Sequence, residues 1–236
     1  PDGYTVLVHS VAFAVNPSLY ADAGYDALKD FVPLALGPKT PNIITVNPSV
    51  AAKTLPELVE AAKKTPMSYA SSGIGTTTHL SMERLKTAAK VDITHVPYQP
   101  AAAINAVVAG HTPMASTSMP PAVPQIKAGK LKALAISSKN RVSALPDVPT
   151  LEESGITGAE SGSWLGLLAP AGTPQPILDK ISQSLQQVLA MPDVQQLLIG
   201  QGAVAKGGTT AEFVNLIAND RKRYAKIILD NKLVVD

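Results

Sequence analysis

The alternation of short β-branched runs with helical segments is the feature that most constrains the fold of this chain. Runs of Val, Ile and Thr bounded by turn residues predict strands, and apolar segments with Thr, Pro or Gly at their ends predict helices. We expect strands over 4–9, 43–46, 68–70, 92–97, 114–117, 131–137 and 165–169, and helices over 55–64, 78–89, 101–109, 121–128, 176–190 and 211–231. An irregular stretch is expected over 138–162. This order predicts an α/β fold whose open sheet has right-handed crossovers, and such sheets bind ligands at the carboxyl ends of their strands.

Composition excludes several classes of function. The chain has 236 residues, with 20 basic against 18 acidic side chains and no basic cluster, so we expect no nucleic-acid partner. It has no cysteine, which excludes disulfides, thiolate metal sites and a Cys nucleophile. Apolar runs such as 131–136 are far shorter than the roughly 20 residues of a membrane span. The opening Pro-Asp-Gly-Tyr is typical of a turn before a strand rather than of a native start.

Residues 69–80 read Tyr-Ala-Ser-Ser-Gly-Ile-Gly-Thr-Thr-Thr-His-Leu, which predicts a strand end, a polar loop and the start of a helix. The N–H groups of a first helical turn have no internal partner, and the helix dipole places positive potential there. Gly73 and Gly75 would let the backbone approach a ligand closely. The hydroxyl groups that could bind an anion belong to Ser71, Ser72, Thr76 and Thr77. The same residues could instead only cap the helix, and the segment alone leaves both interpretations open.

Three further residues are candidates because of their positions. Strands that end at Ser71, Tyr98 and Thr117 should converge on one cleft. The place of Tyr98 just before Gln-Pro favours the cleft over the core. Trp164, the single tryptophan, could pack near a hinge or form a cleft wall.

The four histidines show no spacing typical of a metal site, so we expect neither a metal nor a cofactor. His79 lies close to Ser71 and Ser72, which permits an esterase-type hydrolase as an alternative. However, the chain has no Gly-x-Ser-x-Gly motif and no acidic residue at a suggestive spacing. We therefore expect His79 to pack or hydrogen-bond locally and His95 to be structural.

Six stretches together resemble the Bug, or TctC-like, extracytoplasmic solute receptors of tripartite tricarboxylate transporters. They read Pro-Asp-Gly-Tyr-Thr at 1–5, Tyr-Ala-Ser-Ser-Gly at 69–73, His-Val-Pro-Tyr at 95–98, Ala-Gly-Lys-Leu-Lys-Ala-Leu-Ala at 128–135, Pro-Asp-Val-Pro-Thr at 146–150 and Trp-Leu-Gly-Leu-Leu-Ala-Pro-Ala-Gly-Thr-Pro at 164–174. Each stretch alone is a weak signal, but their order and spacing extend the resemblance over essentially the whole chain.

The resemblance implies a class II periplasmic-binding-protein fold of two lobes, with 1–48 and 166–236 in the first and 49–165 in the second. It implies a non-enzymatic periplasmic receptor that holds a small organic carboxylate in the cleft and delivers it to transporter membrane subunits. A sensor input module for a signalling partner is a further alternative. The expected ligand-binding residues are Ser71, Ser72, Gly73, Gly75, Thr76, Thr77, Tyr98, Thr117 and Trp164.

Two departures from the family pattern matter. Thr117 stands where many relatives place an Asp, so the distal part of the ligand should differ from theirs. The first strand and its Pro/Gly-rich loop, which supply the other half of the carboxylate clamp in relatives, are absent from this sequence. We therefore expect the first lobe to lack its leading βαβ unit, with an exposed sheet edge that permits self-association.

Overall fold

The structure is a computed structural model that describes residues 1–205 and 207–230. The chain forms two compact units, which are described separately. The first unit contains residues 1–39, 163–199 and those from 204 onward, and the second contains 40–162 and 200–203. The lobe boundaries expected from the sequence, at 48/49 and 165/166, and the expected lack of a leading βαβ unit stay predictions.

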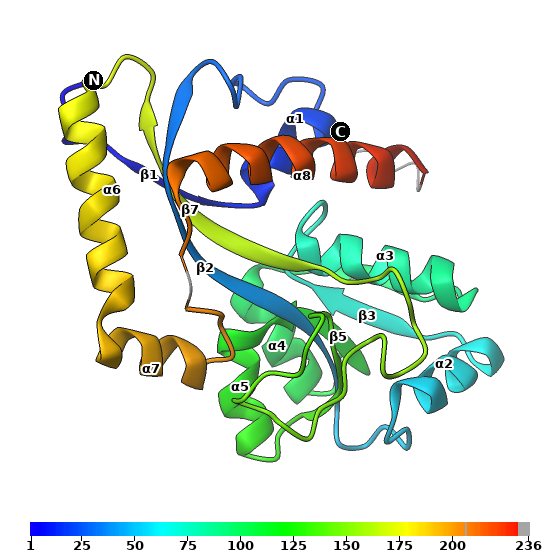
Figure 1. The fold of residues 1–236 in the computed structure, drawn as a ribbon. Helices are drawn as coiled ribbons and strands as arrows, with labels where there is room; N and C mark the ends of the chain where they lie inside the picture. The colour runs from blue at the N-terminus through cyan, green and yellow to red at the C-terminus, as the bar shows by residue number, and fades with distance from the viewer. Residues whose placement is uncertain (206, 231–236) are drawn as a thin grey trace. The chain divides into compact units, whose positions relative to one another are not determined.

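Strand β2 (Phe31–Val46) contributes to both units, with its first part in one and its last part in the other (Figure 1). The sequence predicted only its final segment, 43–46. Residues 31–42 contain Pro33, Gly37, Pro38 and Pro41, which are types that usually end a strand or confine it to an edge. The contacts of the folded chain override these local signals.

In the first unit, β1 (Leu7–Ser10) pairs antiparallel with β7 (Gly162–Pro170), and β7 neighbours β2. Its helices are α1 (Ala12–Leu19), α6 (Gln175–Ala190), α7 (Pro192–Gly200) and α8 (Thr210–Asp230). The predictions at 176–190 and 211–230 are confirmed, and predicted residue 231 lies outside the described residues. Helices α1 and α7 were not expected, because Pro17 lies inside α1 and α7 has no buried residue.

The second unit holds a mixed sheet in which its strands lie in the order β6, β2, β5, β3, β4. Strand β3 is parallel to β4 and β5, whereas β2 is antiparallel to β5 and β6. The elements are α2 (Leu55–Lys64), β3 (Ser68–Ser71), α3 (Thr77–Ala89), β4 (Thr94–Pro97), α4 (Pro100–Val108), β5 (Met114–Ser118), α5 (Met119–Lys127) and β6 (Lys132–Ile136). The predicted α/β alternation is confirmed here.

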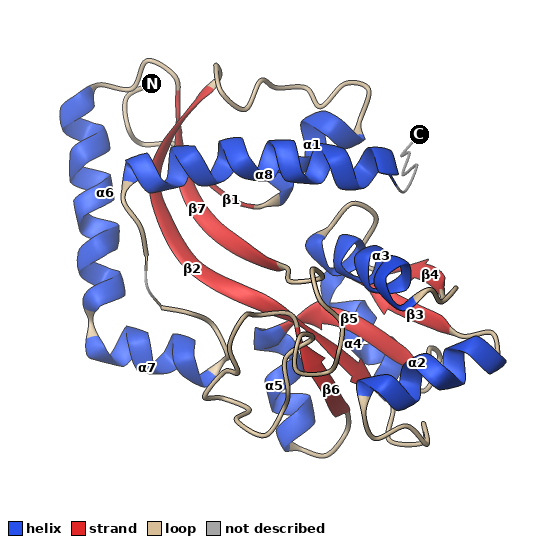
Figure 2. Cartoon of the chain, turned by 45° about the vertical axis from the view of Figure 1, so that its right-hand side comes forward, coloured by secondary structure: helices blue, strands red, loops and turns tan. Residues whose placement is uncertain are grey.

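Helices α2 and α3 pack on one face of this sheet, and α4 and α5 pack on the other (Figure 2). Tyr69 belongs to the core under α2 and α3, whereas Ala70 belongs to the core under α4 and α5. Successive strand residues point to opposite faces, so Ser71 points toward the α2–α3 side. Because β3, β4 and β5 are parallel, their carboxyl ends lie at one edge of the sheet, where the 71–77 loop begins.

The predicted irregular stretch at 138–162 forms turns and extended chain up to β7. Across the described residues, none of the helices combines the length and the apolar character needed to cross a membrane.

Candidate functional site

The 71–77 loop has a backbone that only glycine adopts easily at two points. Gly73 has φ +117° and Gly75 has φ +72°, which lie in the region that L side chains rarely occupy. Thr76 is the N-cap of α3 with extended backbone, and its Oγ1 donates to the Gly73 carbonyl at 2.7 Å. These features turn the chain sharply between β3 and α3.

Four N–H groups of the loop are already engaged, either within the loop or by side chains at the start of α3. That of Thr76 donates to the Gly73 carbonyl at 3.4 Å. The N–H of Ser72 donates to Thr78 Oγ1 at 3.0 Å, and that of Gly73 donates to Ser71 Oγ at 3.2 Å. The N–H of Gly75 donates to His79 Nδ1 at 3.1 Å. These groups therefore shape the loop and are not free donors.

Three other N–H groups have no acceptor among the residues that the structure describes: those of Ile74, Thr77 and Thr78. Thr77 and Thr78 begin α3, a helix of 13 residues with no acidic side chain in its first turn. The helix dipole and these donors favour an anionic oxygen at this point. The unengaged donors therefore occupy only part of the polar loop that the sequence analysis proposed as an anion site.

The loop rests on an aromatic stack that the sequence did not reveal, in which Tyr69 and His79 are buried and His95 is half-buried. Ser71 Oγ and His95 Nε2 lie 2.6 Å apart and share a hydrogen bond. The rings of His79 and His95 are stacked with centroids 4.0 Å apart and an interplanar angle of 13°. The ring of Tyr69 also stacks with that of His95, with centroids 4.9 Å apart. Strand β4 therefore supports the loop through His95, which was expected to be structural.

Both imidazoles are neutral at pH 7. Burial, with a smaller effect from Lys86, lowers the pKa of His79 to about 4. Burial and the neighbouring His79 lower the pKa of His95 to about 4 as well. Glu83 Oε1 accepts hydrogen bonds from Tyr69 Oη at 2.9 Å and from Lys86 Nζ at 3.1 Å, so its charge is compensated. Burial also raises the pKa of Tyr69.

The serine–histidine pairing expected for a hydrolase does not form. His79 accepts from the Gly75 N–H, and its Nε2 lies 3.8 Å from Glu83 Oε1. Ser71 does meet a histidine, His95, but Ser71 is fully buried and already accepts the Gly73 N–H. This hydroxyl is a structural link rather than an accessible nucleophile.

Asn42 fixes the start of α3 from β2 and was missed by the sequence analysis. Its Nδ2 donates to the Thr77 carbonyl at 3.0 Å and to Ser161 Oγ at 3.2 Å. Its own N–H donates to Ser137 Oγ at 2.7 Å. The sequence carried little signal for it, because Asn42 lies just before the expected strand at 43–46 and its burial follows only from the fold.

Tyr98 and Thr117 lie at the expected strand ends. The N–H of Tyr98 donates to the Ser71 carbonyl at 3.1 Å, so Tyr98 adjoins the loop. Thr117 is 1% exposed and its Oγ1 has no hydrogen-bond partner in the described chain. Strand alternation places Thr117 on the α4–α5 face with Ala115, whereas Ser116, whose Oγ also lacks a partner, shares the α2–α3 face with Ser71.

Trp164 belongs to the first unit and is 3% exposed. Its Nε1 donates to Asp220 Oδ2 at 2.8 Å, and its ring meets Phe213 edge-on at 5.0 Å. Burial raises the pKa of Asp220, although the Trp164 hydrogen bond opposes this. These contacts give Trp164 a packing role in that unit, and its expected ligand contact stays a prediction.

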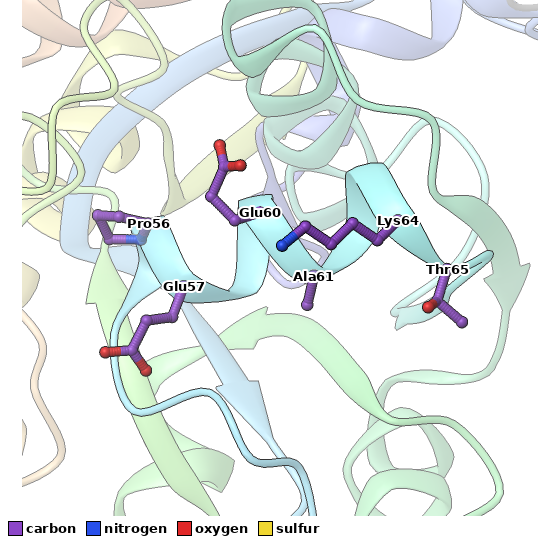
Figure 3. A pocket seen from close by; sticks show the side chains of 6 residues that line it. All are labelled: Pro56, Glu57, Glu60, Ala61, Lys64 and Thr65. Carbon is purple, nitrogen blue, oxygen red and sulfur yellow. The ribbon is translucent and has the colours of Figure 1, made fainter.

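A hollow of about 570 Å³ lies elsewhere, along the outer side of α2 (Figure 3). None of the nine expected ligand-binding residues lines it. Its six lining side chains come from one helix and its end: Pro56, Glu57, Glu60, Ala61, Lys64 and Thr65. The part of the chain that the structure describes also contains no group of three or more His, Asp or Glu side chains placed to hold a metal ion.

The sequence matches the family model described as the tripartite tricarboxylate transporter family receptor over residues 1–233. The chain belongs to this family. The resemblance inferred from the six sequence stretches is therefore confirmed. The tripartite tricarboxylate transporter receptors are solute-binding proteins, which is not a class of enzyme.

Solved structures of similar proteins support this family assignment. The periplasmic binding protein BugD is 33% identical, with a TM-score of 0.92 over 99% of this chain and 80% of that one. Rpa4515 of R. palustris with adipate is 28% identical, with a TM-score of 0.93 over 98% and 79%. MatC of Rhodopseudomonas palustris with bound malate is 30% identical, with a TM-score of 0.87 over 97% and 80%. The periplasmic-binding-protein fold is therefore confirmed, and two of these proteins hold dicarboxylates.

Proposed function

We propose that this chain is a periplasmic receptor that binds a small organic carboxylate at the 71–77 loop. We further propose that it delivers the ligand to the membrane subunits of a tripartite tricarboxylate transporter. The family supports the transport role, and the adipate and malate of two similar proteins support the ligand class. Ligand-sensing for a signalling partner uses the same capture step and remains the second role to test.

The observation that carries the proposal is the set of unengaged N–H groups at Ile74, Thr77 and Thr78. A carboxylate oxygen is the small anionic acceptor that such groups bind, because the charge strengthens each hydrogen bond. The glycines at 73 and 75 keep side chains away from the same stretch of backbone. Ser72, Thr76 and Tyr98 then supply polar atoms beside it, as the family resemblance implies.

Replacing Thr77 by proline tests this directly. Proline lacks the N–H, and it is tolerated at the first position of a helix. The preceding residue, Thr76, already has the extended backbone that a following proline requires, with φ −70° and ψ 160°. The matched control is Thr77→Val, which keeps the N–H and the shape but removes the hydroxyl.

A thermal-shift screen of mono-, di- and aromatic carboxylates, including adipate and malate, would identify ligands for calorimetric titration. We expect Thr77→Pro to weaken carboxylate binding by roughly 1–3 kcal/mol and Thr77→Val to weaken it far less. Equal affinity of Thr77→Pro and the wild type would rule out the N–H of Thr77 as a ligand donor. A failure of every carboxylate to bind the wild type would contradict the proposed ligand class.

We also propose that the protein has no catalytic role, since Ser71 is buried and His79 serves the loop backbone. Ester hydrolysis by the wild type that is lost in His95→Ala would contradict this.

Self-association remains a proposal as well. Strand β1 lies at the end of the strand order, and Val6 and Val8 on or beside it are 40% and 59% exposed. Light scattering after size exclusion should show an oligomer that Val8→Lys dissociates. A monomeric wild type would refute the idea.

A further inference from the structure

His79 accepts a hydrogen bond from the loop through its Nδ1 atom. The imidazole becomes positively charged only if this same nitrogen is protonated. The Gly75 N–H donates to Nδ1 at 3.1 Å, so Nδ1 carries no proton and the neutral ring carries its proton on Nε2. Nε2 points toward Glu83 Oε1 at 3.8 Å. Gly75, with φ +72°, is held in its left-handed conformation by this bond.

Protonation of His79 would turn Nδ1 from an acceptor into a donor. Two N–H groups would then face each other in a site where His79 is 4% exposed. A buried donor without an acceptor is unfavourable, so Gly75 would have to move away. Gly75 precedes the N-cap Thr76 directly, and its movement would displace the donors at Ile74 and Thr77.

We propose that the His79–His95 stack makes the 71–77 loop proton-sensitive: the neutral rings hold the loop in its binding conformation, and protonation of His79 releases it. His79 is then a positioning residue that acts through Gly75. His95 is a positioning residue that acts through Ser71, because their 2.6 Å contact fixes the other end of the loop. The consequence for carboxylate binding rests on the proposed function.

The groups that face the stack favour its neutral form near pH 7. On α3, Lys86 Nζ lies 3.1 Å from Glu83 Oε1 and 3.8 Å from Asp92 Oδ1, which lies before β4. On β3, the hydroxyl of Tyr69 also donates to Glu83. Among the residues that the structure describes, Glu83 is the one carboxylate in contact with His79, and it accepts hydrogen bonds from both of these donors. A positive charge on either imidazole would therefore gain little compensation, and it would also face the other ring at 4.0 Å.

The first test needs no ligand. Nitrogen-15 NMR of the imidazoles reports the tautomer of His79, and the amide resonance of Gly75 reports its hydrogen bond. We expect the Nε2–H tautomer near pH 7 and a Gly75 amide that shifts with the same midpoint as His79 as the pH falls from 7.5 to about 3. The Gly129 amide, which donates to the Ile126 carbonyl in another turn, is the control and should not follow that midpoint.

Two substitutions separate positioning from simple packing. Asparagine can place Oδ1 near the position of Nδ1 but cannot be protonated in this range, so His79→Asn should keep the Gly75 bond and lose its pH dependence. His79→Leu should lose the bond at every pH. The exposed His111 provides the control substitution, His111→Asn, which should change neither property.

The binding arm uses adipate and malate by calorimetry at pH 7.5. We expect His79→Leu to lose affinity by about tenfold or more and His79→Asn to stay within a few fold of the wild type. The Nδ1–H tautomer, or a Gly75 amide that ignores the titration of His79, would overturn the inference. Unchanged affinity in His79→Leu would also overturn it. If neither acid binds the wild type while Gly75 follows His79, the proposed ligand class fails and the proton-sensitive loop stands.

Discussion

Two junctions at the same edge of the second unit's sheet show how differently a strand can pass into a helix. Strand β3 leads into α3 through the glycine-containing 71–77 loop, whereas β5 passes directly from Ser118 into α5. Helix α5 begins with Met119-Pro120-Pro121, so two N–H groups of its first turn do not exist. Helix α3 has no proline there and keeps its donors, two of them without an acceptor. The comparison teaches that the β3–α3 junction has unengaged donors beside a glycine-containing loop, which the proposed anion site requires, and that the β5–α5 junction has no such loop and lacks two of the donors.

The largest expected effect concerns Thr117, at the β5 junction. Because Thr117 is 1% exposed and lies on the apolar α4–α5 face, Thr117→Asp would bury a carboxylate without a partner. We expect it to lower the free energy of unfolding by about 3 kcal/mol or more, measured by urea denaturation. The control is Thr117→Val, which should be nearly neutral because the Oγ1 of Thr117 has no hydrogen bond to lose.

The same pair of variants tests the ligand role predicted for Thr117. If Thr117 contacts the distal end of a ligand, Thr117→Val should change the relative affinities of mono- and dicarboxylates while stability stays the same. Identical affinities for both ligand classes would assign Thr117 to packing alone. The β5 junction would then have no part in binding.

Acid should affect the β3–α3 junction and spare the β5–α5 junction. The pKa of His79 is about 4 in the folded protein against 6.5 for the ordinary side chain, so the unfolded chain binds the extra proton first. The contribution of neutral His79 to the free energy of unfolding is therefore fully present above about pH 6.5. It is lost as the pH drops toward 4, and the loss amounts to about 3 kcal/mol.

Amide exchange at pH 7 and pH 5 would check this prediction locally. We expect protection around the start of α3 to fall more than protection around the start of α5. In His79→Asn the difference between the two junctions should disappear. Equal loss of protection at both junctions in the wild type would show that acid destabilises the unit as a whole.

A smaller effect is expected from Ser72→Ala in the loop. The hydroxyl of Ser72 has no hydrogen bond in the described chain, whereas its N–H is held by Thr78 Oγ1. The substitution should leave stability unchanged and weaken a carboxylate ligand by roughly 1 kcal/mol if the hydroxyl binds it, as calorimetry can measure. Undiminished affinity for every carboxylate would remove Ser72 from the site.

The smallest effect should come from restoring the missing donors of α5. In Pro120→Ala/Pro121→Ala the first turn regains two N–H groups, but β5 still enters the helix without a loop. We expect no carboxylate binding at this junction in a variant that also carries Thr77→Pro, and a change in stability within about 1 kcal/mol. Tighter carboxylate binding by that triple variant than by Thr77→Pro alone would mean that free N–H groups alone suffice.

Much of the fold could be predicted because the signals are local. The helices at 55–64 and 176–190 and the strands around Tyr69 and Ala135 follow from runs of apolar and turn-forming residues. The first part of β2 could not be predicted, since prolines and a glycine obscure it and only pairing with other strands makes it a strand. Helix α7 has no buried residue and so no apolar stripe to reveal it.

By itself, the sequence determined the order of strands and helices, the glycines at 73 and 75 that permit a close turn, and the presence of hydroxyl residues able to cap the helix that follows. These depend on the conformational preferences of residues that are neighbours in the chain. Only the tertiary structure decided what holds the loop in place: His95 reaches the Ser71 hydroxyl across 24 positions, and Asn42 reaches the Thr77 carbonyl across 35. Side chains so distant in sequence meet only when strand register and helix packing bring them together. The residues of the proposed binding loop are therefore set by local sequence, whereas the position of the loop depends on contacts that only the tertiary structure provides.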